Sequence, residues 1–176
     1  MKEQKMQIII TKEEVESRIR QIASQLNEKY KDEKLYLIGT LKGSIFFLCE
    51  LAKQLTMPVI LDFVQVSSYG EEKVSSGIVD KKLDISCDLE KQNILIVEDI
   101  IDTGRTIQYL KEYISEKNPK HLEICTLLDK PAHRVVKDIV ADYTGFVMKE
   151  DKFVVGYGLD YAQMYRNLPY IATIEE

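Results

Sequence analysis

Three acidic side chains follow an aliphatic run near the middle of the chain. Residues 94–97 are Ile-Leu-Ile-Val, Glu98 and Asp99 come next, and Asp102 stands three residues further on. Thr-Gly-Arg-Thr then occupies 103–106, where apolar residues begin to recur at helical spacing. Ligands of open α/β sheets bind beyond the carboxyl ends of the strands, so we expect this strand-to-helix turn to be a binding site.

The residues that open the predicted helix suit a phosphate group. Backbone N–H groups at a helix start point toward an anion and favour it. Gly104 permits close approach of the backbone, Thr103 and Thr106 offer hydroxyl donors, and Arg105 adds a positive charge. We therefore expect this turn to hold a phosphate.

The acidic side chains suit a sugar and a metal ion. Two adjacent carboxylates accept hydrogen bonds from a pair of vicinal hydroxyls, as on a ribose. Three carboxylates repel a phosphate unless a cation lies between them, and Mg²⁺ takes one or two carboxylates together with substrate oxygens. The alternative is a solvated acidic loop in which Asp102 or Thr103 is an ordinary N-cap. The position at a strand end favours the binding site.

Composition limits the classes of partner. The 176 residues include 24 Lys and Arg and 29 Asp and Glu, a net charge of −5, so nucleic-acid binding, which needs a basic face, is not expected. No membrane span or signal peptide is expected either, because no run of 18 apolar residues occurs and the N-terminus is charged. Isolated Cys49, Cys87 and Cys125 indicate reduced thiols and a cytoplasmic protein. The length fits a single domain over 1–176.

Strand-like and helical segments alternate along the chain. This pattern predicts an α/β fold with a mostly parallel central sheet flanked by helices. Thr11 and Glu14 form the capping box of the first helix. A turn is expected at 98–105 and a long polar loop at 67–92. The expected strands cover 7–10, 35–38, 59–66, 93–97, 121–128, 145–148, 154–156 and 170–174, and the expected helices cover 12–30, 44–55 and 106–117.

The stretch at 94–106 resembles the signature of the phosphoribosyltransferases, enzymes that use phosphoribosyl pyrophosphate. Five further segments narrow the resemblance to the bacterial hypoxanthine (hypoxanthine-guanine) branch of this family and extend it over nearly the whole chain. They are Gly-Thr-Leu-Lys-Gly-Ser at 39–44, Ser-Tyr-Gly at 68–70, Leu-Leu-Asp-Lys-Pro at 127–131, Lys-Phe-Val-Val-Gly-Tyr-Gly-Leu-Asp-Tyr at 152–161 and Arg-Asn-Leu-Pro-Tyr at 166–170.

The resemblance implies an enzyme of purine salvage. It would transfer the phosphoribosyl group to N9 of hypoxanthine, and of guanine, releasing pyrophosphate and giving IMP or GMP, with Mg²⁺ as cofactor. It also implies the type I phosphoribosyltransferase fold, with a small hood from the C-terminal part and a flexible loop, and assembly into a homodimer or homotetramer. The alternative is a non-catalytic, phosphoribosyltransferase-like ligand-binding regulator, which the presence of Asp102 and the negative net charge disfavour.

The resemblance also implies roles for the residues of the central turn. Asp102 resembles the general base near purine N7. Glu98 and Asp99 resemble the residues that lie near the ribose hydroxyls and the metal. Residues Thr103, Gly104, Arg105 and Thr106 resemble the cradle of the 5′-phosphate.

Three residues resemble the pyrophosphate contacts of the family. Lys42 and Gly43 follow the second predicted strand, and Arg166 lies near the C-terminus. A guanidinium suits phosphate oxygens because its donors form a planar fork. In the family the peptide bond before this lysine can be cis, which here would be Leu41-Lys42.

Further positions resemble the purine site. Lys130 would donate to the 6-oxo group, Phe153 would stack on the base, and Val154 would contact the base edge through its backbone. Asp160 resembles a metal contact that also lies near the base. Ser68 and Tyr69 head the segment that resembles the mobile loop of the family.

The segment before Phe153 departs from the usual family pattern. That pattern has a Pro-Asp pair close before the aromatic, whereas here the proline is missing and the spacing is one residue longer. Hypoxanthine is therefore the more strongly expected substrate and guanine the less strongly expected one. Gln163 stands where an acidic residue is common.

Two other classes of protein fit the sequence less well. A receiver-type phosphoacceptor has its acidic pair after the first strand, whereas Glu98 and Asp99 come later in this chain. Gly-Tyr-Gly at 156–158 lacks the third glycine of a dinucleotide-binding site.

Overall fold

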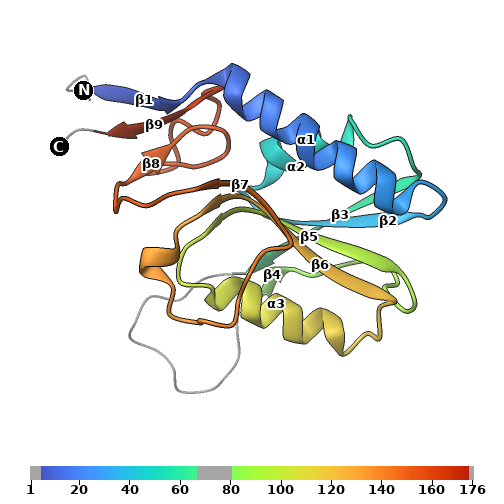
Figure 1. The fold of residues 1–176 in the computed structure, drawn as a ribbon. Helices are drawn as coiled ribbons and strands as arrows, with labels where there is room; N and C mark the ends of the chain where they lie inside the picture. Colours follow the sequence, from blue (N-terminus) through green and yellow to red (C-terminus); the bar gives the residue numbers. More distant parts are fainter. Residues whose placement is uncertain (1–4, 67–80, 175–176) are drawn as a thin grey trace, which may run out of the picture.

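A six-stranded sheet lies at the centre of the molecule (Figure 1), in a computed structural model that describes residues 5–66 and 81–174. The strand order is β4-β3-β2-β5-β6-β7, and every neighbouring pair is parallel except β3 and β4. The strands are β2 (Leu35–Thr40), β3 (Val59–Val66), β4 (Lys81–Leu83), β5 (Asn93–Ile101), β6 (His121–Asp129) and β7 (Tyr143–Val147).

Helices cover both faces of this sheet. Helices α1 (Lys12–Tyr30) and α2 (Ile45–Ala52) lie on one face and α3 (Arg105–Ser115) on the other (Figure 1). Successive residues of a strand point to opposite faces, so Leu35 and Leu37 of β2 join the core under α1 and α2, whereas Ile38 joins the core under α3. Burial on both faces explains why the central strands read as continuous aliphatic runs.

The first helix begins as its sequence predicts. The Thr11 hydroxyl accepts a hydrogen bond from the Glu14 N–H at 3.3 Å, and the Thr11 N–H donates to the Glu14 carboxylate at 2.8 Å. This reciprocal pair satisfies N–H groups that have no partner inside the helix. The expected α/β fold and the capping box are confirmed.

A second, antiparallel sheet joins the two ends of the described chain. Its order is β1-β9-β8, from β1 (Met6–Ile10), β9 (Ile171–Ile174) and β8 (Val154–Val155). The hood expected from the C-terminal part therefore also takes a strand from the N-terminal region. This sheet leads into the tightly turned segment 156–170, which carries several predicted site residues.

Several expected boundaries differ from the structure by one to four residues, such as the helix expected at 44–55, which ends at Ala52. Two differences bear on the site. The turn placed at 98–105 starts too early, because β5 continues to Ile101 while its pairing with β6 persists through Glu98↔Thr126 and Ile101↔Asp129. The loop placed at 67–92 contains β4, which pairs with the end of β3. Predicted loop residues Ser68 and Tyr69 lie outside the described residues. No helix within the described ranges is both long and apolar enough to span a membrane.

Candidate active site

The turn after β5 has the backbone of an anion site. Gly104 adopts a left-handed conformation (φ +83°) directly before α3, whose first residue is Arg105. A side chain on Gly104 would be strained at this φ, and its Cβ would lie 3.0 Å from the Arg134 side chain. The N-cap residue Gly104 has no side chain to cap the helix, and the Arg105 N–H donates to the Thr103 hydroxyl at 3.4 Å. The N–H groups of this first turn suit a phosphate.

Glu98 and Asp99 form a closely spaced acidic pair on β5. The Thr40 hydroxyl donates to Glu98 Oε1 at 2.6 Å, while Glu98 Oε2 is buried without a hydrogen-bond partner. Burial, and then the negative charge of Asp99, raise the pKa of Glu98 well above its ordinary value. A donor or a cation from a ligand would satisfy the unpaired oxygen.

Three distant segments meet at Gly43. A Cβ on Gly43 would lie 1.6 Å from Asp99 Oδ2, so any larger residue between the turn after β2 and strand β5 would displace the Asp99 carboxylate. A Cβ on Gly158 would lie 1.8 Å from the Gly43 carbonyl oxygen, and Gly158 has φ +102°. The Lys42-Gly43 turn, the acidic pair and the C-terminal segment are therefore in direct contact.

A small polar network surrounds Lys42 and Arg166. The Lys42 Nζ donates to Gln163 Oε1 at 3.3 Å, and the peptide bond between Leu41 and Lys42 is cis. Arg166 pairs with Asp160 at 2.7 Å and donates to the Gly158 carbonyl at 2.7 Å, yet its Nε is buried without a partner. Two cations at one edge of the site, one with a free donor, suit an anionic group.

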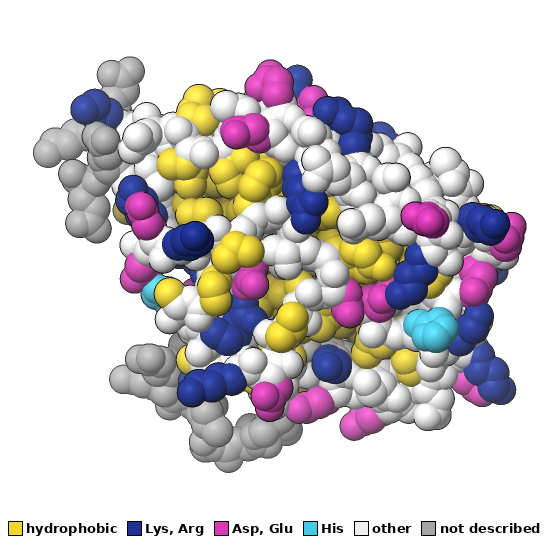
Figure 2. Space-filling view, in the orientation of Figure 1, with side chains coloured by type: hydrophobic (Ala, Val, Ile, Leu, Met, Phe, Trp, Pro, Cys, Tyr) yellow, Lys and Arg dark blue, Asp and Glu magenta, His cyan; other side chains and the backbone are white. Residues whose placement is uncertain are grey.

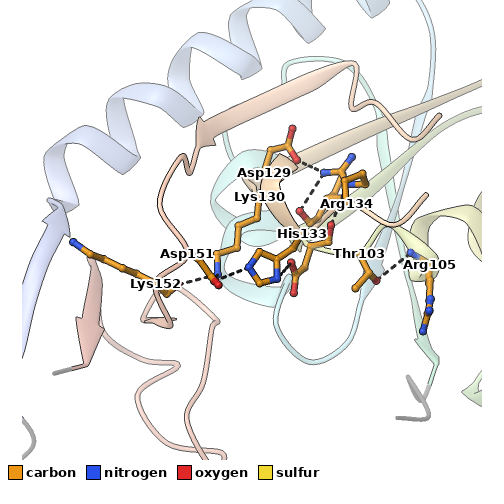
Figure 3. Close-up of polar contacts among 10 residues, drawn as sticks. Thr103, Arg105, Asp129, Lys130, His133, Arg134, Asp151 and Lys152 are labelled. Atoms are coloured by element: carbon orange, nitrogen blue, oxygen red, sulfur yellow. Dashed lines mark hydrogen bonds and ion pairs between the residues drawn. The ribbon is translucent and has the colours of Figure 1, made fainter. Parts of the chain in front are cut away.

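Lys130 lies at the end of β6 and is 8% exposed. Its Nζ donates to the Lys152 carbonyl oxygen at 2.8 Å and lies 3.8 Å from Asp151 Oδ1 (Figure 3). Phe153 is 57% exposed and meets Tyr161 edge to face, with ring centroids 5.8 Å apart. An exposed ring is free to stack on a planar ligand, whereas Val154 is buried in β8.

Sequence reasoning did not find Arg134 and Thr40. Arg134 pairs with Asp129 (Figure 3). It also donates to the carbonyl oxygens of Asp102 at 3.0 Å and Ile101 at 3.2 Å. The N–H groups of residues 135 and 136 each donate to the Thr103 carbonyl at 3.0 Å. These bonds fix the backbone of the turn from outside. No spacing in the sequence indicates them, because their acceptors at 101–103 lie more than 30 residues before the donors.

The residues expected to touch a metal do not form a metal centre alone. Within the described ranges, no group of three or more His, Cys, Asp or Glu side chains is arranged to hold a metal ion. The Glu98–Asp99 pair with its unpaired oxygen still fits Mg²⁺, because that ion takes few protein carboxylates and completes its octahedron with substrate oxygens and water. The geometry thus fits a metal that arrives with a phosphorylated ligand.

Comparisons with known proteins agree with this geometry. The family model described as "Phosphoribosyl transferase domain" matches residues 7–162. The chain belongs to the phosphoribosyltransferase family. It is 43% identical, over 99% of its length and 96% of the relative, to the hypoxanthine-guanine phosphoribosyltransferase of Bacillus subtilis. It is 40% identical to the hypoxanthine phosphoribosyltransferase of Salmonella typhimurium, over 96% of this chain and 95% of that relative.

Solved structures of phosphoribosyltransferases share the fold. A crystal structure of a hypoxanthine-guanine phosphoribosyltransferase from Bacillus anthracis aligns with a TM-score of 0.91 at 39% identity, covering 98% of this chain and all of that one. A hypoxanthine phosphoribosyltransferase from Staphylococcus aureus aligns with a TM-score of 0.90 at 40% identity, covering 96% and 91%. The central sheet and its small companion sheet are therefore the type I phosphoribosyltransferase fold.

Proposed function

We propose that this phosphoribosyltransferase acts in purine salvage, transferring the phosphoribosyl group of phosphoribosyl pyrophosphate to N9 of hypoxanthine, and of guanine. The products are IMP or GMP and pyrophosphate. The observation that carries the proposal is the junction of β5 and α3, where an anion-binding helix start directly follows a buried acidic pair with an unpaired oxygen. By their names, the Bacillus subtilis relative acts on hypoxanthine and guanine and the Salmonella typhimurium relative on hypoxanthine, at 43% and 40% identity over nearly the full chain.

In the proposed roles, the turn holds the substrate by its phosphoribosyl end. The N–H groups and hydroxyls of residues 103–106 bind the 5′-phosphate. Glu98 and Asp99 accept hydrogen bonds from the ribose hydroxyls and stabilise the positive charge that develops on the sugar as its bond to pyrophosphate breaks. Lys42, Gly43 and Arg166 bind the departing pyrophosphate.

A second group of residues binds the purine base. Lys130 donates to the 6-oxo group, Phe153 stacks on the ring, and the Val154 backbone contacts the base edge. Asp102 takes the proton from the purine as N9 attacks, a step to which a positioned general base contributes about 10²–10⁴-fold. A 6-amino group is a donor and faces the lysine unfavourably, so adenine is disfavoured.

The proposal includes Mg²⁺, which Glu98, Asp99 and Asp160 would hold together with the substrate. When bound, the ion neutralises charge on the leaving pyrophosphate. Support comes from the chemistry of the donors, since carboxylates and phosphate oxygens are the ligands that Mg²⁺ prefers.

The proposal also covers assembly and location. Ile45, Phe46 and Leu61 are exposed apolar side chains on α2 and β3, which supports a homodimer or homotetramer. The three cysteines are unpaired, which supports a cytoplasmic protein. Basic and acidic side chains are interspersed on the face drawn in Figure 2, an arrangement that suits small-molecule substrates better than nucleic acid.

A base panel tests the function. Purified protein is incubated with phosphoribosyl pyrophosphate, Mg²⁺ and, in turn, hypoxanthine, guanine, xanthine, adenine and uracil, and pyrophosphate release is measured. We expect release with hypoxanthine and guanine, loss of release in EDTA and recovery on adding Mg²⁺. Release with uracil alone, or full release without metal, would refute the proposal.

A further inference from the structure

His133 lies between two carboxylates from different segments. It ends the short 3₁₀ helix η1 (Pro131–His133), and Figure 3 shows its ring beside the Asp151 side chain. The imidazole Nε2 is 2.6 Å from Asp151 Oδ1, and Nδ1 is 3.5 Å from Asp102 Oδ1. The Asp102 side chain is 47% exposed, but its Oδ1 is buried and has no hydrogen-bond partner.

The other charged groups around this ring are already engaged. Lys130 Nζ donates to the Lys152 carbonyl oxygen and lies 3.8 Å from Asp151. The Lys152 ammonium pairs with Glu150 at 2.6 Å. The Arg134 guanidinium pairs with Asp129 and meets only the backbone carbonyl of Asp102. Of these groups, the imidazole is the one that faces Asp102 Oδ1.

The contact of His133 with the two carboxylates depends on the protonation state of the imidazole. A neutral imidazole has one N–H and one lone pair, so it can donate to Asp151 or to Asp102 but not to both. An imidazolium has two N–H groups, one for each carboxylate. With the single proton on Nε2 toward Asp151, a lone pair would face the Asp102 carboxylate. Only the charged ring holds both partners at once.

We propose that His133 is a positioning residue that holds Asp102 Oδ1, leaves Oδ2 to take the purine proton, and ties Asp102 to segment 149–153, which carries base contacts. The inference rests on the proposed function, in which Asp102 is the general base. Contacts of catalytic groups are often long in the free enzyme and tighten when substrate binds, which fits the 3.5 Å separation.

Variants at position 133 separate the two contacts. His133→Asn keeps a donor near the Nδ1 position, toward Asp102, whereas His133→Gln keeps one near Nε2, toward Asp151. We expect His133→Gln to lower kcat about tenfold, because a misplaced catalytic group reacts slowly, with the KM for phosphoribosyl pyrophosphate unchanged. His133→Asn should retain most of kcat. Both variants should change the pH dependence of kcat, because an amide cannot gain a second N–H as an imidazole can.

The second histidine provides the matched control. His121 lies exposed at the start of β6, at the end of the strand opposite Lys130, and takes no part in the site. His121→Gln should keep the native kcat and pH profile. Circular dichroism and thermal melting check that each variant is folded, and Asp151→Asn probes the same contact without changing His133.

A readout that does not depend on turnover completes the test. The chain has two histidines, so the protein shows two imidazole Hε1 NMR signals, which His121→Gln assigns. In the free protein, Asp102→Asn and Asp151→Asn should each move the titration of the His133 signal to lower pH, because each removes a carboxylate that favours imidazolium. The His121 signal should not move.

Three results would contradict a positioning role for His133. A native kcat profile in His133→Gln, an equal loss of kcat in His121→Gln, or a His133 titration that Asp102→Asn leaves in place would overturn the inference. An inactive native protein whose His133 titration still responds to Asp102→Asn would instead refute the proposed function and leave the contact standing.

Discussion

Asp62 and Glu98 are carboxylates on two parallel strands of one sheet, but their surroundings are opposite. Asp62, on β3, accepts hydrogen bonds from the N–H groups of Phe63, Ser86 and Cys87 at 2.7–2.8 Å. Burial alone would raise the pKa of Asp62, and the hydrogen bonds outweigh it and lower that pKa to about 2. Glu98, on β5, accepts a hydrogen bond from the Thr40 hydroxyl, and burial, followed by the charge of Asp99, raises its pKa.

The comparison distinguishes Asp62, a carboxylate that stabilises the fold, from Glu98, a carboxylate expected to bind a ligand. Asp62 ties β3 to residues 86–87 and satisfies backbone donors there. Glu98 keeps a buried oxygen without a partner, which costs stability in the free protein. Groups with strongly shifted pKa values are common at functional sites, where a bound ligand supplies the hydrogen-bond donor or charge that the free protein does not provide. The phosphoribosyltransferase chemistry is expected at β5 and not at β3.

The largest expected effect is on Asp102, at the end of the strand that carries Glu98. Asp102→Asn keeps the shape of the side chain but removes its basicity, so turnover should fall by about 10²–10⁴-fold with little change in substrate binding. Steady-state kinetics with hypoxanthine measure it. Unchanged turnover would remove Asp102 from the role of base.

Base selectivity should change when Lys130 is replaced. Lys130→Gln exchanges a charged donor for an amide that can donate or accept, so the preference for hypoxanthine over adenine should relax by about 1.5–3 kcal/mol, roughly 10–100-fold. The ratio of kcat/KM for the two bases measures this. Identical selectivity in the variant would contradict contact with the 6-oxo group.

A pair of isosteric variants addresses the two contrasted carboxylates directly. Asp62→Asn should lower the free energy of unfolding by about 1–2 kcal/mol, because three N–H groups lose a charged acceptor, while kcat stays native. Glu98→Gln should leave thermal stability unchanged or raised, because it removes a buried charge, but should raise the KM for phosphoribosyl pyrophosphate. A stability loss in Glu98→Gln with native kinetics would break the contrast.

The smallest effect is in the pH dependence of stability, where the two groups have opposite signs. The lowered pKa of Asp62 gives stabilisation that is present above 3.8, its ordinary value, and is lost as pH falls toward about 2. The raised pKa of Glu98 gives stabilisation that is complete below 4.5 and is lost as pH rises. Urea unfolding of the native protein and both variants between pH 2 and pH 8 resolves the two slopes.

Local patterns in the sequence predict much of this fold. The Thr11 capping box, the aliphatic run before Glu98 and the glycine that opens α3 each depend on near neighbours, and the structure has all three. The end of β5 was placed too early because polar residues there read as a turn, whereas pairing with β6 keeps them in the strand.

Contacts between distant segments could not be predicted from the sequence alone. Thr40 reaches Glu98 across 58 residues, and Arg134 reaches Asp102 across 32. His133 and Asp151 meet because η1 and the segment before Phe153 fold against each other. Such partners depend on how the loops pack at one sheet edge, and residue types carry no local signal of that.

The central claim is that the turn from β5 into α3 binds a sugar phosphate. A crystal structure of the protein with IMP tests it most directly. We expect the 5′-phosphate on the N–H groups of residues 103–106 and the ribose hydroxyls within hydrogen-bond distance of Glu98 and Asp99. A nucleotide bound with its phosphate and ribose elsewhere would contradict the account.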